Sequence, residues 1–443
     1  MRTKHRKQKV NVITLGCSKN LVDSEVMMGQ LRANKFDVEH EKENDDSNIV
    51  IINTCGFIDN AKQESINTIL EYAELKQQGE IEKLYVTGCL SERYRNDLKT
   101  EMPQVDAWFG TMELPQLLSK LGADYKKDLV GERQQVTPPH YAYLKISEGC
   151  NRTCAFCAIP LMRGKHVSKP IEEIISEAEK LVKRGVKELM LIAQELTYYG
   201  LDIYKERKLA ELLEQLSDVE GLKWIRLHYA YPSKFPEEIL EVVRAKKNIC
   251  NYIDIPFQHV SNNMLQRMRR LITKEETIEL IKTIRSKVPG IAIRTTFLVG
   301  FPGETEKDVD ELVEFVREMK FDRAGVFTYS HEEGTAAFEV RDDVPRKVKA
   351  ARAARVMKAQ EDVSFDLNQL RIGKTLEVLI DREEGGYLIG RTEYDSPEVD
   401  NEVMIDAKEF SPTFIQRHIG EMVSVKITDA SEFDLTGKIV STH

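Results

Sequence analysis

Apolar positions in the first part of the chain alternate between two kinds of spacing. β-rich runs fall at Val10–Leu15, Asn48–Asn53 and Lys83–Thr87. Between them the apolar residues recur at the spacing of an amphipathic helix. These helical segments are Leu21–Ala33, Ile58–Leu75 and Glu113–Lys120. The alternation predicts a parallel α/β sheet domain over residues 1–136.

The same alternation then repeats six times over residues 137 to about 340. The predicted strands are Ala142–Ser147, Glu188–Ala193, Trp224–Tyr229, Tyr252–Ile255, Ile291–Val299 and Ala324–Tyr329, with helices such as Ile171–Lys183 and Glu304–Met319 between them. Because six units are too few to close an eight-unit barrel, we expect an open partial (β/α)6 barrel. A helix over residues 345–370 extends this domain to 137–370, and its Lys and Arg residues favour a solvated face over a binding site.

The last segment changes character and predicts a third domain over residues 371–443. Short runs with turn residues between them indicate a small antiparallel β-barrel. The expected strands are Leu376–Ile380, Tyr387–Arg391, Glu402–Ile405 and Met422–Thr428. This segment holds eight Lys and Arg against fifteen Asp and Glu, a net charge of −7.

Composition excludes several classes of protein. The chain has 443 residues, 41% hydrophobic and 31% charged, and a net charge of −9, so the whole chain is not a generic nucleic-acid binder. No apolar run is long enough to span a membrane. The basic start, Met1–Lys9, precedes an apolar stretch too short for a signal peptide, so we expect a cytoplasmic protein. No coiled-coil pattern is present, which favours a monomer.

Three cysteines in one loop carry the most specific chemistry. Cys150, Cys154 and Cys157 follow the first barrel strand at C-x3-C-x2-C spacing. Three thiolates can hold three irons of a cubane cluster, which leaves the fourth iron open for chemistry. Barrel sites lie at the carboxyl ends of the strands, where this loop is predicted to be.

Three further cysteines share one structural position in the first domain. Cys17, Cys55 and Cys89 each follow a predicted strand, and each has a glycine beside it. Because the carboxyl ends of parallel strands lie on one edge of a sheet, the three thiols are expected to converge on a second three-thiolate cluster. The alternatives are three buried small hydrophobes, or a zinc site, although structural zinc usually takes four protein ligands.

These motifs resemble the radical S-adenosylmethionine methylthiotransferases over essentially the full length. The matching segments are Gly16-Cys17-Ser18-Lys19-Asn20, Asn53-Thr54-Cys55-Gly56-Phe57, Thr87-Gly88-Cys89, Ser147-Glu148-Gly149-Cys150 and Gly300-Phe301-Pro302-Gly303-Glu304. The resemblance implies two 4Fe–4S clusters, one on each cysteine trio, a radical S-adenosylmethionine barrel and a terminal barrel of the TRAM kind. Ser18-Lys19 stands where the tRNA-modifying branch typically has Gln-Met.

The resemblance is therefore to the branch that methylthiolates the β-carbon of an aspartate in ribosomal protein S-twelve. It implies that one S-adenosylmethionine methylates the sulfur and a second gives the 5′-deoxyadenosyl radical. The implied partners are protein S-twelve, free or in the small ribosomal subunit, an electron donor such as flavodoxin or ferredoxin, and a sulfide source. Acidic residues Glu393, Asp395, Glu398, Asp400 and Glu402 in the last domain would repel RNA and attract a basic protein.

The S-adenosylmethionine contacts implied by the resemblance are less specific. The candidates are Phe156, Gln194, Arg294, Leu298 and Gly300, each of which has barrel packing or a strand-end turn as an alternative. Relatives often have Asp-Thr-Thr after the glutamine, so a side-chain role for Glu195 is in doubt. His259 is a cavity-lining or a structural residue, and Cys250 is expected to be inert. No catalytic side chain is predicted beyond the cluster ligands.

Two other functions remain open at this point. One is methylthiolation of a tRNA adenosine by the same chemistry. The other is a metal-containing RNA-binding module without catalysis, which the complete C-x3-C-x2-C motif and six barrel units disfavour.

Overall fold

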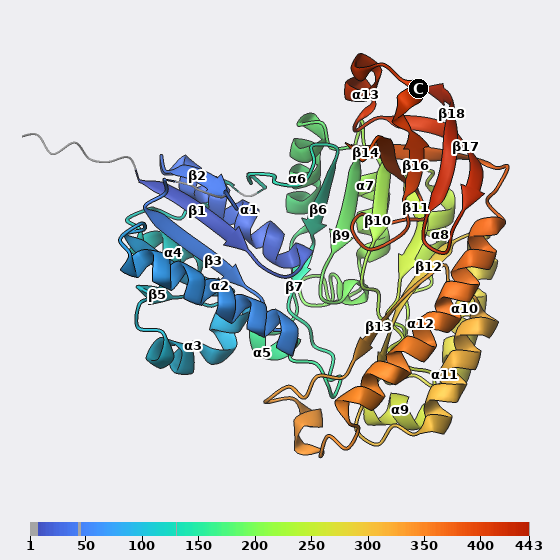
Figure 1. The fold of residues 1–443 in the computed structure, drawn as a ribbon, viewed down its shortest axis with the longest axis horizontal. Helices are drawn as coiled ribbons and strands as arrows, with labels where there is room; N and C mark the ends of the chain where they lie inside the picture. Colours follow the sequence, from blue (N-terminus) through green and yellow to red (C-terminus); the bar gives the residue numbers. More distant parts are fainter. Residues whose placement is uncertain (1–7, 43–45, 130, 443) are drawn as a thin grey trace, which may run out of the picture.

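The computed structural model describes residues 8–42, 46–129 and 131–442. Most of the basic start predicted for Met1–Lys9 lies outside the described residues. Three large sheets follow one another along the described chain, and the helix-covered central sheet lies between the first and the last (Figure 1). Within the described part of the chain, no helix is both long enough and apolar enough to cross a membrane.

The first sheet is parallel, with the strand order β2-β1-β3-β4-β5. Its strands are β1 (Lys9–Thr14), β2 (Asp37–His40), β3 (Ile49–Thr54), β4 (Lys83–Gly88) and β5 (Ala107–Trp108). Its helices are α1 (Ser18–Ala33), α2 (Asp59–Gln77), α3 (Cys89–Glu101) and α4 (Leu114–Lys120). Every residue of β3 is buried, as expected for a central parallel strand with helices on both faces.

The second sheet has six parallel strands in the order β13-β12-β11-β10-β9-β6, and it is open. Its strands are β6 (Tyr141–Lys145), β9 (Glu188–Ile192), β10 (Trp224–Leu227), β11 (Ile249–Asp254), β12 (Ala292–Val299) and β13 (Arg323–Thr328). Its helices are α6 (Ile171–Lys183), α7 (Leu209–Ser217), α8 (Glu238–Ala245), α9 (Asn262–Arg267), α10 (Lys274–Lys287) and α11 (Glu306–Met319). The predicted open partial barrel is thus confirmed, with one apolar core between sheet and helices.

Two short strands and a short helix follow β6. Strands β7 (Ser147–Glu148) and β8 (Val167–Ser168) pair with each other, and α5 (Ile159–Arg163) lies between them in the chain. These elements frame the loop that carries Cys150, Cys154 and Cys157.

A long helix connects the barrel to the last sheet. Helix α12 (Arg346–Gln369) packs on α11 and β13. Its cations are not all solvated: Lys349 bonds Asp342, and Arg352 pairs with Glu304. Lys349 and Arg352 are buried and fasten the helix to the barrel, whereas Arg346, Lys347 and Arg355 are exposed as predicted for a solvated face.

The last sheet is a closed five-stranded barrel in the order β14-β15-β16-β18-β17. Its strands are β14 (Thr375–Glu384), β15 (Tyr387–Thr392), β16 (Val403–Asp406), β17 (Met422–Ala430) and β18 (Leu435–Thr442), and a helix α13 (Pro412–His418) precedes β17. The sequence pattern missed β18, which completes the closure. It also missed β2, α3 and β5 in the first domain.

The acidic loop of this last barrel, residues 392–401, inserts against the central sheet on the side of its amino ends; we call it the plug loop. Asp395 bonds Arg323, and Asp400 accepts hydrogen bonds from Arg294 and Tyr252. Asp395 is 1% exposed, and the side chain of Asp400 is fully buried. These carboxylates therefore neutralise the protein's own cations, which corrects the prediction that they form an exposed surface for a basic partner.

Candidate active site

The first cysteine trio lies at one edge of the first sheet. Cys17 precedes α1, Cys55 follows β3, and Cys89 begins α3 directly after β4. Strands β1, β3 and β4 are consecutive neighbours in the parallel sheet, so their carboxyl ends adjoin. Cys17 is exposed, whereas Cys55 and Cys89 are buried.

Glycine allows these loops to touch. A Cβ added to Gly16 would lie 2.8 Å from Cys55 Sγ, and one added to Gly56 would lie 2.8 Å from the Leu90 backbone. Both distances are shorter than side-chain carbon contacts allow, so the close approach requires glycine. The glycines that adjoin Cys17 and Cys55 thus permit the close packing of these loops.

Asn20 holds the cysteine loops together. Its Nδ2 donates to the carbonyl oxygens of Leu15 and Thr54, at 2.7 and 3.1 Å. Its Oδ1 accepts from Arg163 and lies 3.8 Å from Cys89 Sγ. One fully buried amide thus fixes the positions of loops that carry all three cysteines.

The three thiols also affect one another electrostatically. Burial raises the pKa of Cys55, and neighbouring Cys17 raises it further. Burial raises the pKa of Cys89 to about 12, where the Arg163 guanidinium acts in the opposite direction. The buried thiols of Cys55 and Cys89 are therefore held in the neutral form, and a bound metal centre would supply the charge that stabilises their thiolates.

The second trio lies in the loop after β7. The Cys150 backbone N–H donates to Gly164 O at 3.1 Å, and the loop is anchored by Arg152. The Arg152 guanidinium lies between the rings of Tyr198 and Tyr231, 3.9 and 3.8 Å from their centroids. It also donates to Glu195 at 3.2 Å, so the Glu195 carboxylate helps to hold the arginine of the cysteine loop.

A second arginine lies against the sulfur of Cys154. Arg270 donates to Cys154 Sγ at 3.2 Å and to the Pro256 carbonyl at 2.5 Å, and its guanidinium lies over Tyr231. Burial raises the pKa of Cys150 to about 11 and that of Cys157 to about 12, and the neighbouring thiols add to both shifts. Nothing in the sequence marks Arg270, since it follows α9 in a basic run far from the cysteine motif.

The two trios meet at α5. Cys89 packs in one buried apolar cluster with Ala158 and Met162, directly after Cys157. Arg163 at the end of α5 donates to Asp23 of the first domain at 2.6 Å and to Glu148 at 3.2 Å. The structure therefore places Cys89 against the segment that directly follows Cys157, 68 residues later in the chain.

A buried ion network lies beside this junction. Lys145 pairs with Asp23 and Glu148, and Gln194 donates to Glu148 at 2.5 Å. Burial opposes ionisation of Glu148, but Lys145 and Arg163 lower its pKa to about 2. Gln194, predicted from the resemblance, thus belongs to the network that joins the two domains.

The other predicted S-adenosylmethionine contacts divide into two groups. Phe156 and Leu298 pack in one apolar cluster with Ala155 of the cysteine loop. Gly300 follows β12 with φ +76, and an added Cβ would meet Lys349 at 2.3 Å. Arg294 lies near the other end of β12, where it pairs with Asp254 and Asp400. None of these placements tests a cofactor contact, so all four stay predictions.

His259 and Cys250 have structural surroundings. His259 Nδ1 accepts from the N–H groups of Val260 and Ser261, and its Nε2 lies 3.4 Å from Glu304. Cys250 is 2% exposed and packs with Trp224. Both fit the structural alternatives that the sequence offered.

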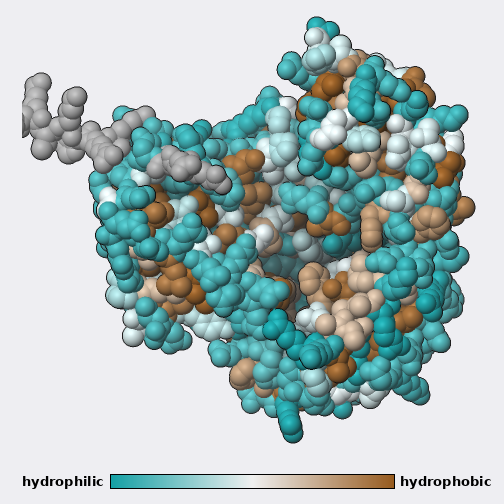
Figure 2. Space-filling view, in the orientation of Figure 1, coloured by the Kyte–Doolittle hydropathy of each residue, from teal (hydrophilic) through white to brown (hydrophobic). Residues whose placement is uncertain are grey.

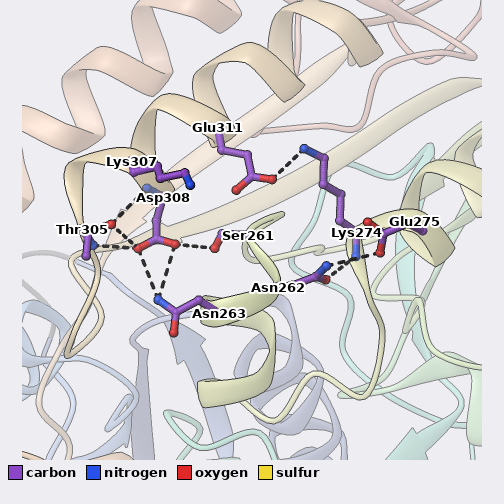
Figure 3. A pocket seen from close by; sticks show the side chains of 9 residues that line it. All are labelled: Ser261, Asn262, Asn263, Lys274, Glu275, Thr305, Lys307, Asp308 and Glu311. Atoms are coloured by element: carbon purple, nitrogen blue, oxygen red, sulfur yellow. Dashed lines mark hydrogen bonds and ion pairs between the residues drawn. The ribbon is translucent and has the colours of Figure 1, made fainter.

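Two depressions mark the surface. One, of about 460 Å³, lies between the first two domains, and its lining includes Asn53 and Gly88 beside the first trio and Glu148 beside the second. Figure 2 shows the molecule hollowed between these domains. The other, of about 500 Å³, lies among α9, α10 and α11 (Figure 3). There Asp308 caps α11 by accepting from Thr305, so its polar groups serve the helix end.

The donor chemistry of both trios fits an iron–sulfur cluster. Each trio offers three thiols, and arginines lie beside Cys89 and Cys154 to offset thiolate charge. Across residues 8–42, 46–129 and 131–442, no group of three or more His, Cys, Asp or Glu is arranged to hold a single metal ion.

Family models match all three parts of the chain. Residues 9–110 match the family described as "Uncharacterized protein family UPF0004", residues 144–316 the radical SAM superfamily, and residues 372–440 the TRAM domain. Radical SAM enzymes use S-adenosylmethionine with a 4Fe–4S cluster, which agrees with the cluster predicted from the C-x3-C-x2-C motif and with the S-adenosylmethionine implied by the resemblance.

Curated relatives match over nearly the whole length. A protein of Cytophaga hutchinsonii is 60% identical over 98% of this chain and 99% of its own, and one of Flavobacterium johnsoniae is 61% identical over 99% and 100%. One of Bacteroides thetaiotaomicron is 52% identical over 99% and 100%. All three are named ribosomal protein uS12 methylthiotransferase RimO.

Solved structures share the fold at low identity. The radical S-adenosylmethionine methyltransferase TsrM of Kitasatospora setae, with cobalamin and a 4Fe–4S cluster bound, matches with a TM-score of 0.53 and 14% identity. The match covers 87% of this chain and 81% of that one. At that identity the likeness speaks for the fold alone.

Proposed function

Because this chain belongs to the RimO family of radical S-adenosylmethionine methylthiotransferases, we propose that it methylthiolates the β-carbon of an aspartate in ribosomal protein uS12. The observation that carries the proposal is the meeting of two cysteine trios at α5, within a chain 52 to 61% identical to relatives named for that reaction. Two sites side by side suit a reaction that needs both a radical and a sulfur donor.

Each trio has its own role in the proposal. Cys150, Cys154 and Cys157 would hold the cluster that works with S-adenosylmethionine, and Cys17, Cys55 and Cys89 would hold the sulfur-donating cluster. When bound, these groups supply hydrogen abstraction from an unactivated carbon and the methylthio group. No side-chain acid or base can break such a C–H bond, so the protein's part is to bind, orient and shield.

The chain's own residues perform that part. Arg270 places a cation at Cys154, and Arg163 places one near Cys89, which offsets the charge of the thiolates. Leu298, Phe301 and Tyr329 form a buried apolar wall behind the cysteine loop. Apolar walls keep water from reactive intermediates, and the surrounding low dielectric strengthens the ion pairs that fix the geometry.

Ion pairs across the domain boundary fix the distance between the trios. Asp23 of α1 binds both Lys145 and Arg163 of the barrel, and Glu332, after β13, binds Lys62 and Arg93 of the first domain. The first domain is thus fastened near both edges of the open barrel. Because Arg93 and Glu332 are 4% and 3% exposed, this contact is not a screened surface pair.

The mass of the modified molecule tests the proposal. In cells that lack this protein, tryptic peptides of uS12 should lose a methylthio mass gain while tRNA nucleosides keep theirs. The opposite pattern, with unchanged uS12 and a tRNA adenosine that loses its methylthio group, would replace the proposal with the tRNA alternative.

A further inference from the structure

The open six-stranded sheet ends in two strands, β6 and β13, and each has one unpaired side (Figure 1). An unpaired strand side presents a row of backbone N–H and C=O groups, which proteins normally cover or blunt. The two strands differ in how far this chain covers them.

The free side of β6 is covered by the segment that precedes it. The Tyr141 carbonyl accepts from Gln135 Nε2 at 3.0 Å and from Thr137 Oγ1 at 2.7 Å, and the Tyr143 carbonyl accepts from Arg133. Arg133 is itself held by carboxylates of α1 and α6. Strand addition at β6 is therefore blocked by the protein itself.

The free side of β13 has no such cover. The Tyr329 N–H donates to Val299 O, and backbone groups alternate in direction along a strand, so those of Ala324, Val326 and Thr328 point away from β12. No other strand of the described residues pairs with β13, and no described side chain hydrogen-bonds these three backbones.

Helix α12 packs on β13, and the exposed part of the strand is its carboxyl end. Thr328 is exposed, and Phe327 is 55% exposed although it is a large apolar residue. A Cβ added to Gly325 would meet nothing within 4 Å. An exposed aromatic residue beside free backbone groups is typical of a binding edge, because the aromatic face can cover an added strand.

The edge also leads to the cysteine loop. Tyr329, the residue after β13, packs in one buried cluster with Ala155 and Leu298. The Ala337 N–H, in the segment that follows, donates to the Ala155 carbonyl at 2.8 Å. A segment laid along β13 would therefore run towards Cys154 and Cys157, where the reacting residue must arrive.

We propose that β13 is the docking edge for the substrate, on which an extended segment of the ribosomal protein adds as a seventh strand. This inference rests on the function proposed above. Backbone N–H and C=O groups at the spacing of a strand match another polypeptide, whereas a nucleic acid has none. In this mode of recognition, main-chain hydrogen bonds give affinity. Phe327 and the unobstructed space above Gly325 would accommodate side chains of the added strand.

Hydrogen exchange on the intact, anaerobically reconstituted enzyme tests the docking edge. Purified uS12 should slow exchange in the peptide that covers residues 322–329 by about tenfold or more. Exchange in β6 should stay unchanged, since its edge is already covered. Unchanged exchange in residues 322–329 at saturating uS12 would overturn the inference, as would protection by tRNA in place of uS12.

A matched pair of variants gives a second test. Thr328→Pro removes an outward N–H without removing a bond to β12, and its exposed side chain costs little packing. It should weaken uS12 binding about threefold to tenfold, the value of one hydrogen bond, whereas Thr328→Ala should bind as the wild type does. Equal affinities of the two variants would contradict the inference.

The two proposals fail in different ways. If the enzyme methylthiolates uS12 while the β13 amides stay unprotected, the docking edge is wrong and the proposed function stands. If uS12 gains no methylthio mass and tRNA does, the proposed function is wrong. S-adenosylmethionine cleavage without substrate should be the same in both Thr328 variants, which shows that the cluster site is intact.

Discussion

The two ends of the six-stranded sheet differ in how their ionisable side chains are stabilised. At the amino ends, Glu188 pairs with Arg226 and Arg391, and the plug loop neutralises Arg294 and Arg323. At the carboxyl ends the functional groups are thiols, and burial raises the pKa values of Cys150 and Cys157. One end is complete without a ligand, whereas the other needs a metal centre to stabilise its thiolates.

This difference follows from the cost of burying charge. A buried ion is tolerated when it is paired and hydrogen-bonded, and the amino end meets that condition with charges from two domains. A buried neutral thiol costs little, so the carboxyl end can fold before its cofactors bind. The amino end is therefore expected to govern stability, and the carboxyl end activity.

Removal of a cysteine at each end should give the largest contrast. Cys157→Ala should lower the iron content from about eight to about four per chain. It should also lower the methylthiolation rate by at least about a thousandfold. Cys250→Ala, at the amino end of β11, should keep all the iron and lose about 1 to 2 kcal/mol of stability. Iron analysis measures the iron content of both variants, and mass spectrometry of uS12 measures their activity. Loss of iron in Cys250→Ala would contradict the division of roles between the two ends.

Breaking the charge network at the amino end should give the next largest effect. Glu188→Gln leaves Arg226 and Arg391 short of a buried counter-charge and should lower the unfolding free energy by about 3 to 5 kcal/mol. Glu384→Gln, in an exposed pair with Arg382, should change it by less than about 0.5 kcal/mol. Urea unfolding compares the two, and equal midpoints would show that the Glu188 charge network does not stabilise the fold.

His228, which is hydrogen-bonded to Ser396 of the plug loop, should make stability sensitive to acid. Burial, then the nearby Arg294 and Arg226, hold its pKa well below 6.5. Below pH 6.5 the unfolded chain therefore takes up a proton that the folded protein refuses, and stability falls as pH decreases. This adds a slope of up to about 1.4 kcal/mol per pH unit, which His228→Gln should remove.

Unfolding free energies measured at intervals from pH 7 to about pH 5 give that slope. Glu188 and Asp381 have lowered pKa values, so their contributions are lost only at lower pH, as it falls through those values. Identical slopes in the wild type and His228→Gln would show that the histidine is protonated without cost.

The smallest effect on stability is expected for a plug-loop residue that is exposed to solvent. Glu398 is exposed, and its contact is a 3.4 Å hydrogen bond from Tyr143. Glu398→Gln should change the unfolding free energy by no more than about 0.5 kcal/mol. Asp395→Asn, which weakens the buried pair with Arg323, should cost several times more, and equal effects would contradict the burial argument.

Some of this arrangement follows from the sequence and some does not. The positions of the first cysteine trio were predictable from the sequence. Buried strands are recognisable as apolar runs, and each cysteine of the trio directly follows one. The plug loop was not, because a count of charges does not distinguish a carboxylate on the surface from one facing a buried arginine. Asp400 lies 106 residues from Arg294, and no local pattern links them.

The arginines beside the thiols show the same limit. Arg163 follows the C-x3-C-x2-C motif closely, yet its partner Asp23 lies 140 residues away. Arg270 reaches Cys154 across 116 residues. Only the three-dimensional fold brings such pairs together, so the sequence indicates the ligands but not the cations beside them.

The most direct test of the central claim is a reaction with both candidate substrates in one tube. The anaerobically reconstituted chain, with S-adenosylmethionine, sulfide and a reductant, is given equal amounts of purified uS12 and unmodified tRNA. Mass spectrometry should find the methylthio group on an aspartate of uS12 and none on tRNA. Methylthiolated tRNA beside unmodified uS12 would contradict the account.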